Sequence, residues 1–205
     1  MPPKQVRQRR SPTQERAKAT RRHILDTAAK LFGERGIGNT STNRIAAEAE
    51  VSVGTVYRYF ADRSVMVDEL LEWLLVTVEQ RIKQCLDELA EKSSPELIAS
   101  ILTVATDVLV DNASLVRALV ADLQFYDTVI PEFEPRLHRV IETLITRILG
   151  PGDEHQHRRM TSTALDTMFA IVLRTALESD SVRRGEYIVA TSRMITHWIE
   201  PQLDP

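Results

Sequence analysis

The segment from Ile45 to Phe60, IAAEAEVSVGTVYRYF, constrains the fold most strongly, because two short apolar patterns flank a tight polar turn. With 3.6 residues per turn, the first pattern forms the inner face of a helix, and the side chain of Val51 fills the inside of the turn that follows. The apolar residues of this first helix are Ile45, Ala46 and Ala49. Those expected on the inner stripe of the second are Val53, Val56, Tyr57 and Phe60. The spacing therefore predicts a helix-turn-helix.

The outer side of the second helix carries small or hydrogen-bonding residues and one cation: Ser52, Gly54, Thr55, Arg58 and Tyr59. Such a surface suits contact with DNA phosphates and base edges. Gly54 is the most informative of them, because a glycine inside an exposed helix costs about 1 kcal/mol relative to alanine. Its presence indicates a backbone that must come close to something. The alternative is a chance amphipathic pair of helices in an all-helical protein.

The flanking segments carry helix start and stop signals. Residues 21–36, RRHILDTAAKLFGERG, place apolar side chains at helical spacing and end at Gly36, a typical C-terminal cap. Ser41 or Thr42 can cap the next helix, whose free N–H groups would face outward as a phosphate site. Asp62 is placed to cap a long helix from Arg63, where a cation can pin the opposite backbone.

These motifs in this order resemble the N-terminal domain of the tetracycline-repressor-like (TetR/AcrR) transcriptional regulators. The resemblance covers about a quarter of the chain, residues 21–71, through AAKLFGERG, the ST..IA start of the next helix and VS.GTVYRYF. It implies a three-helix DNA-binding domain joined to an all-helical effector-binding and dimerisation domain. It also implies a homodimer, acting as a repressor that leaves a pseudo-palindromic operator when a small molecule binds.

Two positions relate this chain to the family pattern in detail. Glu50 stands in the turn where the family usually has glycine. If that position is left-handed, glutamate costs about 1–2 kcal/mol there. Arg63 fills the position of the family's phosphate-binding lysine. We expect phosphate contacts from Thr42, Tyr57, Tyr59 and Arg63, base contacts from Gly54, Thr55 and Arg58, and rim contacts from Ser52 and Val53, with Arg44 completing the DNA-binding set.

The charge is divided along the chain. Residues 1–63 hold 13 Lys and Arg against 6 Asp and Glu, whereas the remaining 142 residues hold 13 against 23. A basic end is attracted to a polyanion, and an acidic body keeps the protein in solution. We expect residues 1–14 to form a basic disordered arm, 15–63 the DNA-binding domain, and 64–205 the effector-binding and dimerisation domain. The arm either lies along DNA or is a solvated terminus without a DNA role.

The remaining composition argues against other classes of protein. We see no apolar stretch of about 18 residues and no apolar core of a signal peptide, and Cys85 is the single cysteine, so we expect a cytoplasmic protein without a membrane partner. Cys85 is a small core residue or a redox sensor. Glu154, His155 and His157 form an isolated polar loop or, less simply, a metal site. Without a P-loop, dinucleotide fingerprint, nucleophile elbow or zinc cysteines, we expect no enzyme, cofactor or metal.

The chain beyond the first domain reads as helices separated by short breakers. We expect helices over 63–91, 94–111, 114–127, 131–148, 158–178 and 183–199, which gives an all-α protein of about nine helices. The rival interpretation is a helical ligand-binding or scaffold protein, such as a nucleoid-associated DNA binder without an effector. Specific DNA binding and its release by a metabolite would distinguish the two.

The last two helices have broad apolar stripes that one small body cannot bury on both sides. We expect them to form a symmetric four-helix interface between two copies, or alternatively to close the core of one copy. The residues assigned to this interface are Leu165, Val172, Leu173, Tyr187, Thr191, Met194, Ile195 and Trp198.

An apolar effector pocket between helices is expected from scattered large side chains. Its candidate residues are Trp73, Asp107, Phe125, Tyr126, Asp166 and Phe169, with Phe133, Met160 and Met168 as further candidates. Asp166 shares a stripe with Phe169 and Leu173, where an unpaired carboxylate would be costly. It either pairs with a basic residue such as Arg174 or meets a polar group of the ligand, and Asp107 has the same two interpretations.

Overall fold

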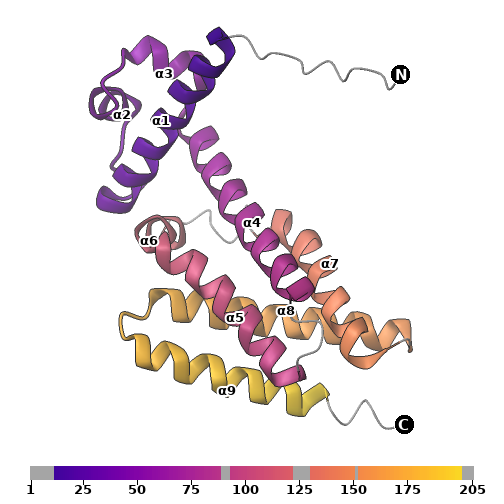
Figure 1. Ribbon diagram of the computed structural model, residues 1–205. Coiled ribbons are helices and arrows are strands. Elements are labelled where there is room, and N and C mark those ends of the chain that lie inside the picture. The colour runs from indigo at the N-terminus through magenta and orange to yellow at the C-terminus, as the bar shows by residue number, and fades with distance from the viewer. Residues whose placement is uncertain (1–11, 89–92, 122–129, 151, 200–205) are drawn as a thin grey trace, which may run out of the picture. The chain divides into compact units, whose positions relative to one another are not determined.

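The computed structural model describes residues 12–88, 93–121, 130–150 and 152–199. Over these residues the secondary structure is helical, with no strands, as expected for an all-α protein. Nine helices are present in this part of the chain (Figure 1): α1 Pro12–Arg35, α2 Thr42–Glu48, α3 Val53–Tyr59, α4 Arg63–Glu88, α5 Ser94–Asp111, α6 Ala113–Ala121, α7 Ile130–Leu149, α8 Glu154–Leu177 and α9 Ser181–Ile199.

The chain divides into two compact units, unit 1 from Met1 to Leu70 and unit 2 from Leu71 to Pro205. The division falls inside α4, so the first two turns of that helix belong to unit 1. Met66 and Leu70 are buried there, which explains why the compact unit ends beyond residue 63, the bound that we expected from the sequence.

Unit 1 is built on α1, whose apolar residues at helical spacing are all buried: Ile24, Leu25, Ala28, Leu31 and Phe32. The helix ends at Gly36, which has a φ of 82° and donates its N–H to the Phe32 carbonyl at 2.8 Å, as the cap prediction requires. Its start differs from our expectation, because α1 begins at Pro12 rather than near Arg21. The three residues from Pro12 to Gln14, which the sequence pattern assigned to the arm, are therefore helical.

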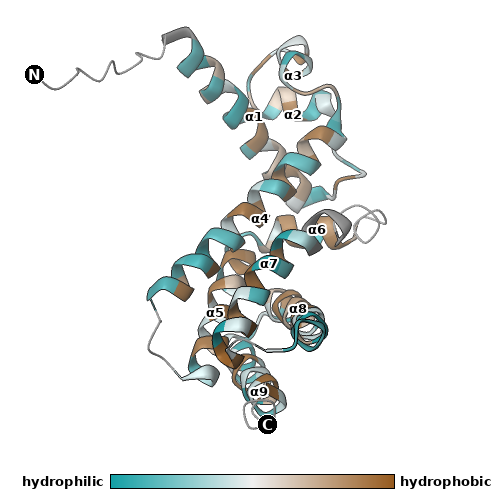
Figure 2. Cartoon of the chain, turned by 90° about the vertical axis from the view of Figure 1, so that its right-hand side faces the viewer, coloured by the Kyte–Doolittle hydropathy of each residue, from teal (hydrophilic) through white to brown (hydrophobic). Residues whose placement is uncertain are grey.

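Unit 2 is a bundle in which α5 packs against α8 and α9, α8 packs against α9, and α7 packs against α8. The hydropathy colouring shows apolar residues on the sides of these helices that face one another (Figure 2). Ser93 and Glu96 form a capping box at the start of α5, and Pro95 occupies its first turn, as expected. Inside the bundle the Thr106 and Thr175 hydroxyls hydrogen-bond at 3.0 Å and join α5 to α8.

The bounds of α6 and α8 differ most from the expected ranges, whereas those of α7 and α9 differ by one or two residues. The expected start of α8 at residue 158 is four residues late, because Asp153 caps the helix by accepting the His155 N–H at 3.0 Å. The helix expected over 114–127 corresponds to α6, and its expected end lies outside the described residues. Among the described residues, no single helix has the length and apolar composition to cross a membrane, although α5 and α6, bent by 85°, pass that test as a pair.

Candidate functional site

The helix-turn-helix is formed by α2 and α3, and serine hydroxyls cap both helices. Ser41 Oγ accepts a hydrogen bond from the Arg44 N–H at 3.3 Å. Ser52 Oγ accepts one from the Thr55 N–H at 3.1 Å and lies 2.8 Å from the Thr55 hydroxyl. Each cap satisfies an N–H group that an isolated helix start would leave unpaired. The polar residues of this motif therefore define where each short helix begins.

The turn between these helices contains Glu50 in the left-handed conformation, with a φ of 53°. The Glu50 and Val51 N–H groups donate to the Ala47 and Ala46 carbonyls at 3.2 and 3.0 Å, which closes the end of α2. His23 Nε2 of α1 lies 3.2 Å from the Ala49 carbonyl. A residue with a Cβ is disfavoured at such a φ by about 1–2 kcal/mol. The turn thus keeps a geometry suited to glycine although a glutamate occupies it.

The inner stripe of α3 is narrower than the sequence suggested. Val56 and Phe60 are buried, but Val53 is 38% and Tyr57 53% exposed. Val53 is the first residue of a seven-residue helix, and its side chain does not reach the core. Tyr57 turns its hydroxyl to the Thr42 hydroxyl of α2, at 3.1 Å. The structure corrects the expectation that both residues lie inside, and it leaves both on the accessible side of the motif.

Gly54 lies on the exposed surface of α3, and packing within the chain does not require a glycine there. A Cβ built at this position would have the Ser52 Oγ, at 3.9 Å, as its nearest neighbour, which is an ordinary van der Waals contact. Arg58 is also exposed, and its guanidinium lies 5.3 Å from the centre of the Tyr59 ring. The described residues therefore make no contact that a Cβ at this position would disrupt.

Arg63, at the start of α4, binds the loop between α1 and α2. Its Nη1 donates to the carbonyl oxygens of Ile37, Gly38 and Thr40 at 2.7, 3.1 and 3.2 Å. The side chain borders an open groove of about 430 Å³, together with Thr42 and Tyr57. Arg63 thus pins the opposite backbone, as expected for a cation at this position, and also lies beside two of the expected phosphate ligands.

The cap of α4 is also present. Asp62 Oδ1 accepts hydrogen bonds from the Ser64 hydroxyl at 2.6 Å and from the Val65 N–H at 3.2 Å. The Ser64 hydroxyl, followed by the Val65 N–H, lowers the pKa of the Asp62 carboxyl below its usual value. The carboxylate therefore stays ionised in the groove that it shares with Arg63.

A contact that the sequence analysis missed joins the two longest helices of unit 1. Arg21 of α1 forms a two-pronged ion pair with Glu69 of α4, and its guanidinium lies 4.7 Å from the centre of the Phe60 ring. The two charged residues are 48 positions apart, so helical periodicity offers no signal for the pairing. This contact ties α4 to the end of the α3 segment.

Unit 2 contains an apolar cavity of about 90 Å³ between α4, α5, α6, α7 and α8. The described residues that line it are all apolar, and examples are Leu71, Val78, Ile101, Ile141 and Phe169. Of our candidate pocket residues, Phe169 and Met168 line this cavity, while Trp73, Asp107, Met160 and Asp166 do not. Phe125 and Tyr126 lie outside the described residues, as does the side chain of Phe133.

Asp107 and Asp166 are both exposed, which corrects the placement of Asp166 on an apolar stripe. On α8 the buried side includes Leu165, Met168 and Val172, and Asp166 projects from the other side of the helix. In the sequence, the apolar residues of α8 extend so far around the helix that its buried side could be placed in two ways. Over the described residues, neither Asp166 nor Asp107 forms an ion pair.

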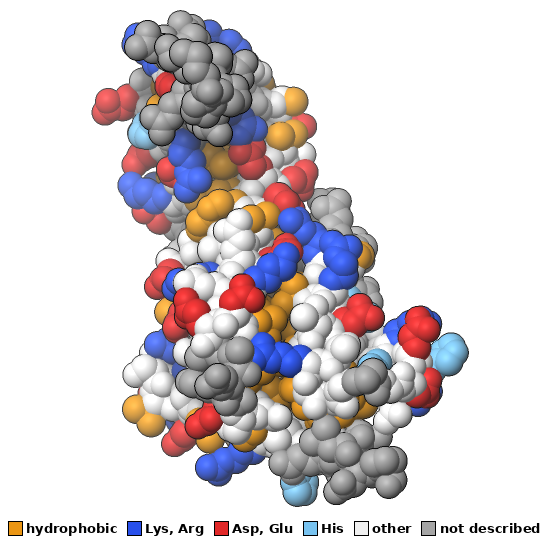
Figure 3. Space-filling view, turned by 45° about the vertical axis from the view of Figure 1, so that its right-hand side comes forward, with side chains coloured by type: hydrophobic (Ala, Val, Ile, Leu, Met, Phe, Trp, Pro, Cys, Tyr) orange, Lys and Arg blue, Asp and Glu red, His pale blue; other side chains and the backbone are white. Residues whose placement is uncertain are grey.

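The residues assigned to a dimer interface fall into two groups. Leu165, Val172, Thr191 and Ile195 are buried within the single chain, and Leu173 lines the cavity. Tyr187, Met194 and Trp198 of α9 are 37%, 56% and 38% exposed and share one side of that helix. Space-filling colours show hydrophobic side chains between charged ones on the visible face of unit 2 (Figure 3).

The histidines near the start of α8 do not gather with other ligands. Within the described ranges, no group of three His, Cys, Asp or Glu residues is arranged to hold a metal ion. Cys85 is buried on α4, as a small core residue would be.

The geometry of unit 1 defines a helix-turn-helix protein whose second helix exposes a narrow polar surface. Residues 24–70 match the family model of bacterial regulatory proteins of the tetR family. The helix-turn-helix of this chain, about a quarter of its length, is therefore similar to that of the tetR-family regulators.

Known regulators and a solved structure are also similar to this chain. The chain is 33% identical over 115 residues to an HTH-type transcriptional regulator of Staphylococcus aureus, a match that covers 55% of this chain and 61% of the relative. It is 42% identical over 60 residues to the HTH-type transcriptional regulator AcrR of Shigella flexneri, over 29% of this chain and 28% of that one. A TetR-family regulator from Mesorhizobium loti has a similar fold, with a TM-score of 0.68 at 18% identity over 89% of this chain and 98% of its own.

Proposed function

We propose that this protein is a homodimeric transcriptional repressor that binds a pseudo-palindromic DNA operator and is released from it by a small molecule. The observation that carries the proposal is the outer surface of α3, where Gly54 is exposed without an internal packing reason. A close approach of DNA to this backbone accounts for it. A regulator of this kind acts on DNA in the cytoplasm and performs no catalysis.

The DNA contacts follow from the chemistry of the exposed groups. The hydroxyls of Thr42 and Tyr57 lie 3.1 Å apart beside Arg63 and can hydrogen-bond to one phosphate oxygen. The start of α2 adds positively polarised N–H groups, and Tyr59 and Arg44 extend the phosphate contacts. Gly54, Thr55 and Arg58 then approach base edges, with Ser52 and Val53 at the rim of the groove.

Dimerisation is required because a single short recognition helix offers too little contact for a specific site. The exposed residues Tyr187, Met194 and Trp198 of α9 supply large apolar area for the interface. Ala170 of α8 is also exposed and can extend it. The buried residues that the sequence assigned to the interface support this surface from inside the chain.

The binding experiment is selection of bound sequences from a random duplex library, followed by affinity measurements on Arg58→Ala. We expect one pseudo-palindromic sequence to be enriched. The substitution should change the base preference at one position of each half-site, at a cost of about 1–3 kcal/mol. Recovery of all sequences in equal proportion would instead favour a nucleoid-associated DNA binder. An unchanged base preference in the variant would mean that Arg58 contacts only the backbone.

Release by the effector requires two states of the dimer. Recognition helices that read successive turns on one face of DNA are about 34–36 Å apart. Because α4 continues from unit 1 into unit 2, we propose that a ligand in unit 2 moves α4 and changes this spacing. By linkage, DNA then weakens ligand binding by the same factor.

The spacing can be measured with spin labels at residue 58 of both subunits, with and without a ligand that releases DNA. The distance distribution should shift by several ångströms. If it stays the same, loss of order in unit 1 becomes the better explanation of release.

A further inference from the structure

Among the described residues that line the cavity of unit 2, none carries a group that could neutralise a charge. Residues from five helices line it, and each of them carries an apolar side chain. Asp107 and Asp166, the acidic residues that the sequence suggested for this site, are exposed elsewhere. An ionised ligand group placed here would lose its hydration without gaining a partner.

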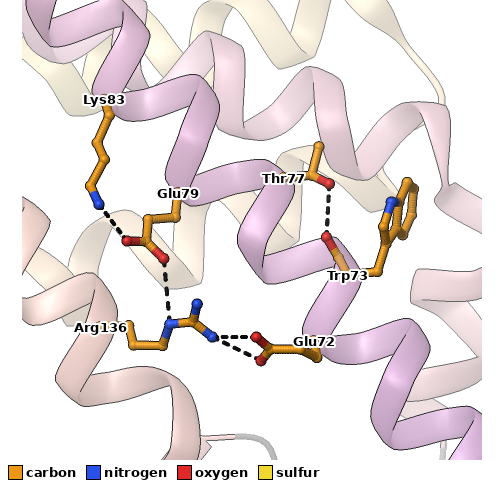
Figure 4. A network of polar contacts seen from close by, with 6 residues as sticks. All are labelled: Glu72, Trp73, Thr77, Glu79, Lys83 and Arg136. Atoms are coloured by element: carbon orange, nitrogen blue, oxygen red, sulfur yellow. Dashed lines mark hydrogen bonds and ion pairs between the residues drawn. The ribbon is translucent and has the colours of Figure 1, made fainter. Parts of the chain in front are cut away.

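The charges beside the cavity are already engaged with one another. Arg136 of α7 donates to both carboxylate oxygens of Glu72, at 2.6 and 2.8 Å, and lies 3.4 Å from Glu79. Lys83 completes the group by donating to Glu79 at 2.6 Å (Figure 4). Arg139 of α7 is a further cation whose charge acts on Glu79. The carboxylates of Glu72 and Glu79 are therefore already neutralised by cations of the protein and are not available to pair with a cationic ligand.

This cluster lies along the seam between two walls of the cavity. Leu71 and Val78, which line the cavity from α4, immediately precede Glu72 and Glu79, and Leu137 of α7 follows Arg136. Further along the same pair of helices, Arg147 donates to the Leu86 carbonyl at 2.7 Å. We call the ion pairs of Arg136 with Glu72 and Glu79 the Arg136 bridge. This bridge holds α7 against α4 beside the cavity.

The size of the cavity shows that a ligand must displace one of these walls. At about 90 Å³ it is smaller than the apolar cavity of roughly 150 Å³ that accepts benzene in another protein. The wall between α5 and α8 is held by the buried pair Thr106 and Thr175, whose separation would take the Thr175 partner away from the Thr106 hydroxyl. The Arg136 bridge is partly exposed, with 33% of the Arg136 and 54% of the Glu72 side chain accessible, so water can replace its bonds.

We propose that the effector is an uncharged, hydrocarbon-like molecule, and that it fits the cavity only after α7 moves away from α4 at the Arg136 bridge. This inference rests on the proposed effector role of unit 2. It makes the Arg136 bridge a latch that sets the affinity for the ligand, while the apolar walls select its chemical class.

The ligand class can be tested by titrating the full-length protein, without DNA, with 1-octanol, octanoate and octylammonium at neutral pH. These probes share one chain and differ in charge. We expect 1-octanol to bind, and both ionic probes to bind at least about 100-fold more weakly, because each would bring an unpaired charge into the cavity. Ala105→Leu, which adds three carbon atoms to a buried lining residue, should abolish 1-octanol binding while the helical circular dichroism signal is retained.

The latch is tested with Arg136→Gln and, as a control, Arg159→Gln, which removes the same charge from an exposed position of α8. The first variant should bind 1-octanol about three- to tenfold more tightly, because the ion pairs no longer oppose opening. The control should bind like the unaltered protein.

Three outcomes would overturn the proposal: an ionic probe that binds as tightly as 1-octanol, an unchanged affinity in Ala105→Leu, or equal affinities in the two arginine variants. The proposed function is tested separately, by adding 1-octanol to the protein–DNA complex. If 1-octanol binds as described but leaves that complex intact, the effector role fails while the chemistry of the cavity stands.

Discussion

Replacing Gly54 with alanine should stabilise the protein and weaken its binding to DNA. Alanine is favoured over glycine inside a helix by about 0.8–1 kcal/mol. The new methyl group would meet only the Ser52 Oγ at 3.9 Å, so no clash reduces this gain. Because Gly54 lies in the first turn of a seven-residue helix, we expect about 0.5–1 kcal/mol of added stability.

The weaker binding to DNA follows from where that methyl group stands. It would lie on the surface that carries Thr55 and Arg58, and it would hold α3 away from the groove. A well-formed side-chain contact to a base contributes about 1–3 kcal/mol, and the dimer would forgo one in each half-site. Binding to the selected operator should therefore weaken by at least about tenfold.

Gly185→Ala is a matched control, because Gly185 lies in α9 and a Cβ there would meet nothing within 4 Å. Urea denaturation should show a similar gain in stability for both variants, and fluorescence anisotropy with labelled operator should show a lower affinity for Gly54→Ala alone. If Gly54→Ala bound operator as tightly as the unaltered protein, the glycine would not be an approach point for DNA. The main support for the proposed function would then be gone.

Three further predictions concern unit 1. Glu50→Gly should raise the free energy of unfolding by about 1 kcal/mol, measured by urea denaturation, since it relieves a side chain at a φ of 53°; a lower value would show that Glu50 makes a compensating contact. Deleting residues 1–11, which contain Lys4, Arg7, Arg9 and Arg10, should weaken DNA binding at low salt. The slope of log K against log salt concentration should change by about 0.9 for each phosphate that the arm neutralises. An unaltered slope would show that the arm makes no contact with DNA. Asp62→Ala should lower the melting temperature at neutral pH. Because the stabilisation comes from the ionised carboxylate, the difference in melting temperature from the unaltered protein should shrink as the pH falls below the usual Asp pKa of 3.8 through the lowered value. A difference in melting temperature that persisted at low pH would point to packing instead.

The local elements of this fold could be predicted from the sequence because each carries its own signals. Ser41, Ser52 and Gly36 mark helix ends through side-chain caps and a left-handed backbone, and these depend on neighbouring residues alone. The burial of Ile45 and Phe32 follows from their helical spacing in the same way. Predictions of this kind need no knowledge of which helices meet.

The side of a helix that faces the core could not be fixed in the same way. On α8 the apolar residues extend far enough around the helix that Asp166 could be placed beside the core, and only packing against α5, α7 and α9 decides that it is exposed. Partners across long sequence separations are equally inaccessible. Arg136 and Glu72 are 64 positions apart, and neither residue differs from an ordinary surface charge until α7 meets α4.

Two residues in the helix-turn-helix differ from the residue type that their backbone conformation favours. Glu50 has a left-handed φ that glycine would adopt without strain, whereas Gly54 occupies a helical position that alanine would stabilise. Exchanging each for the locally preferred residue would favour folding, and the two residues lie four positions apart. Stability alone therefore does not explain this segment. At Gly54 the conflict has a reason if DNA comes within reach of the backbone, and the same reasoning predicts that the strained turn at Glu50 belongs to the DNA-binding surface, where a cost in folding energy is offset by function.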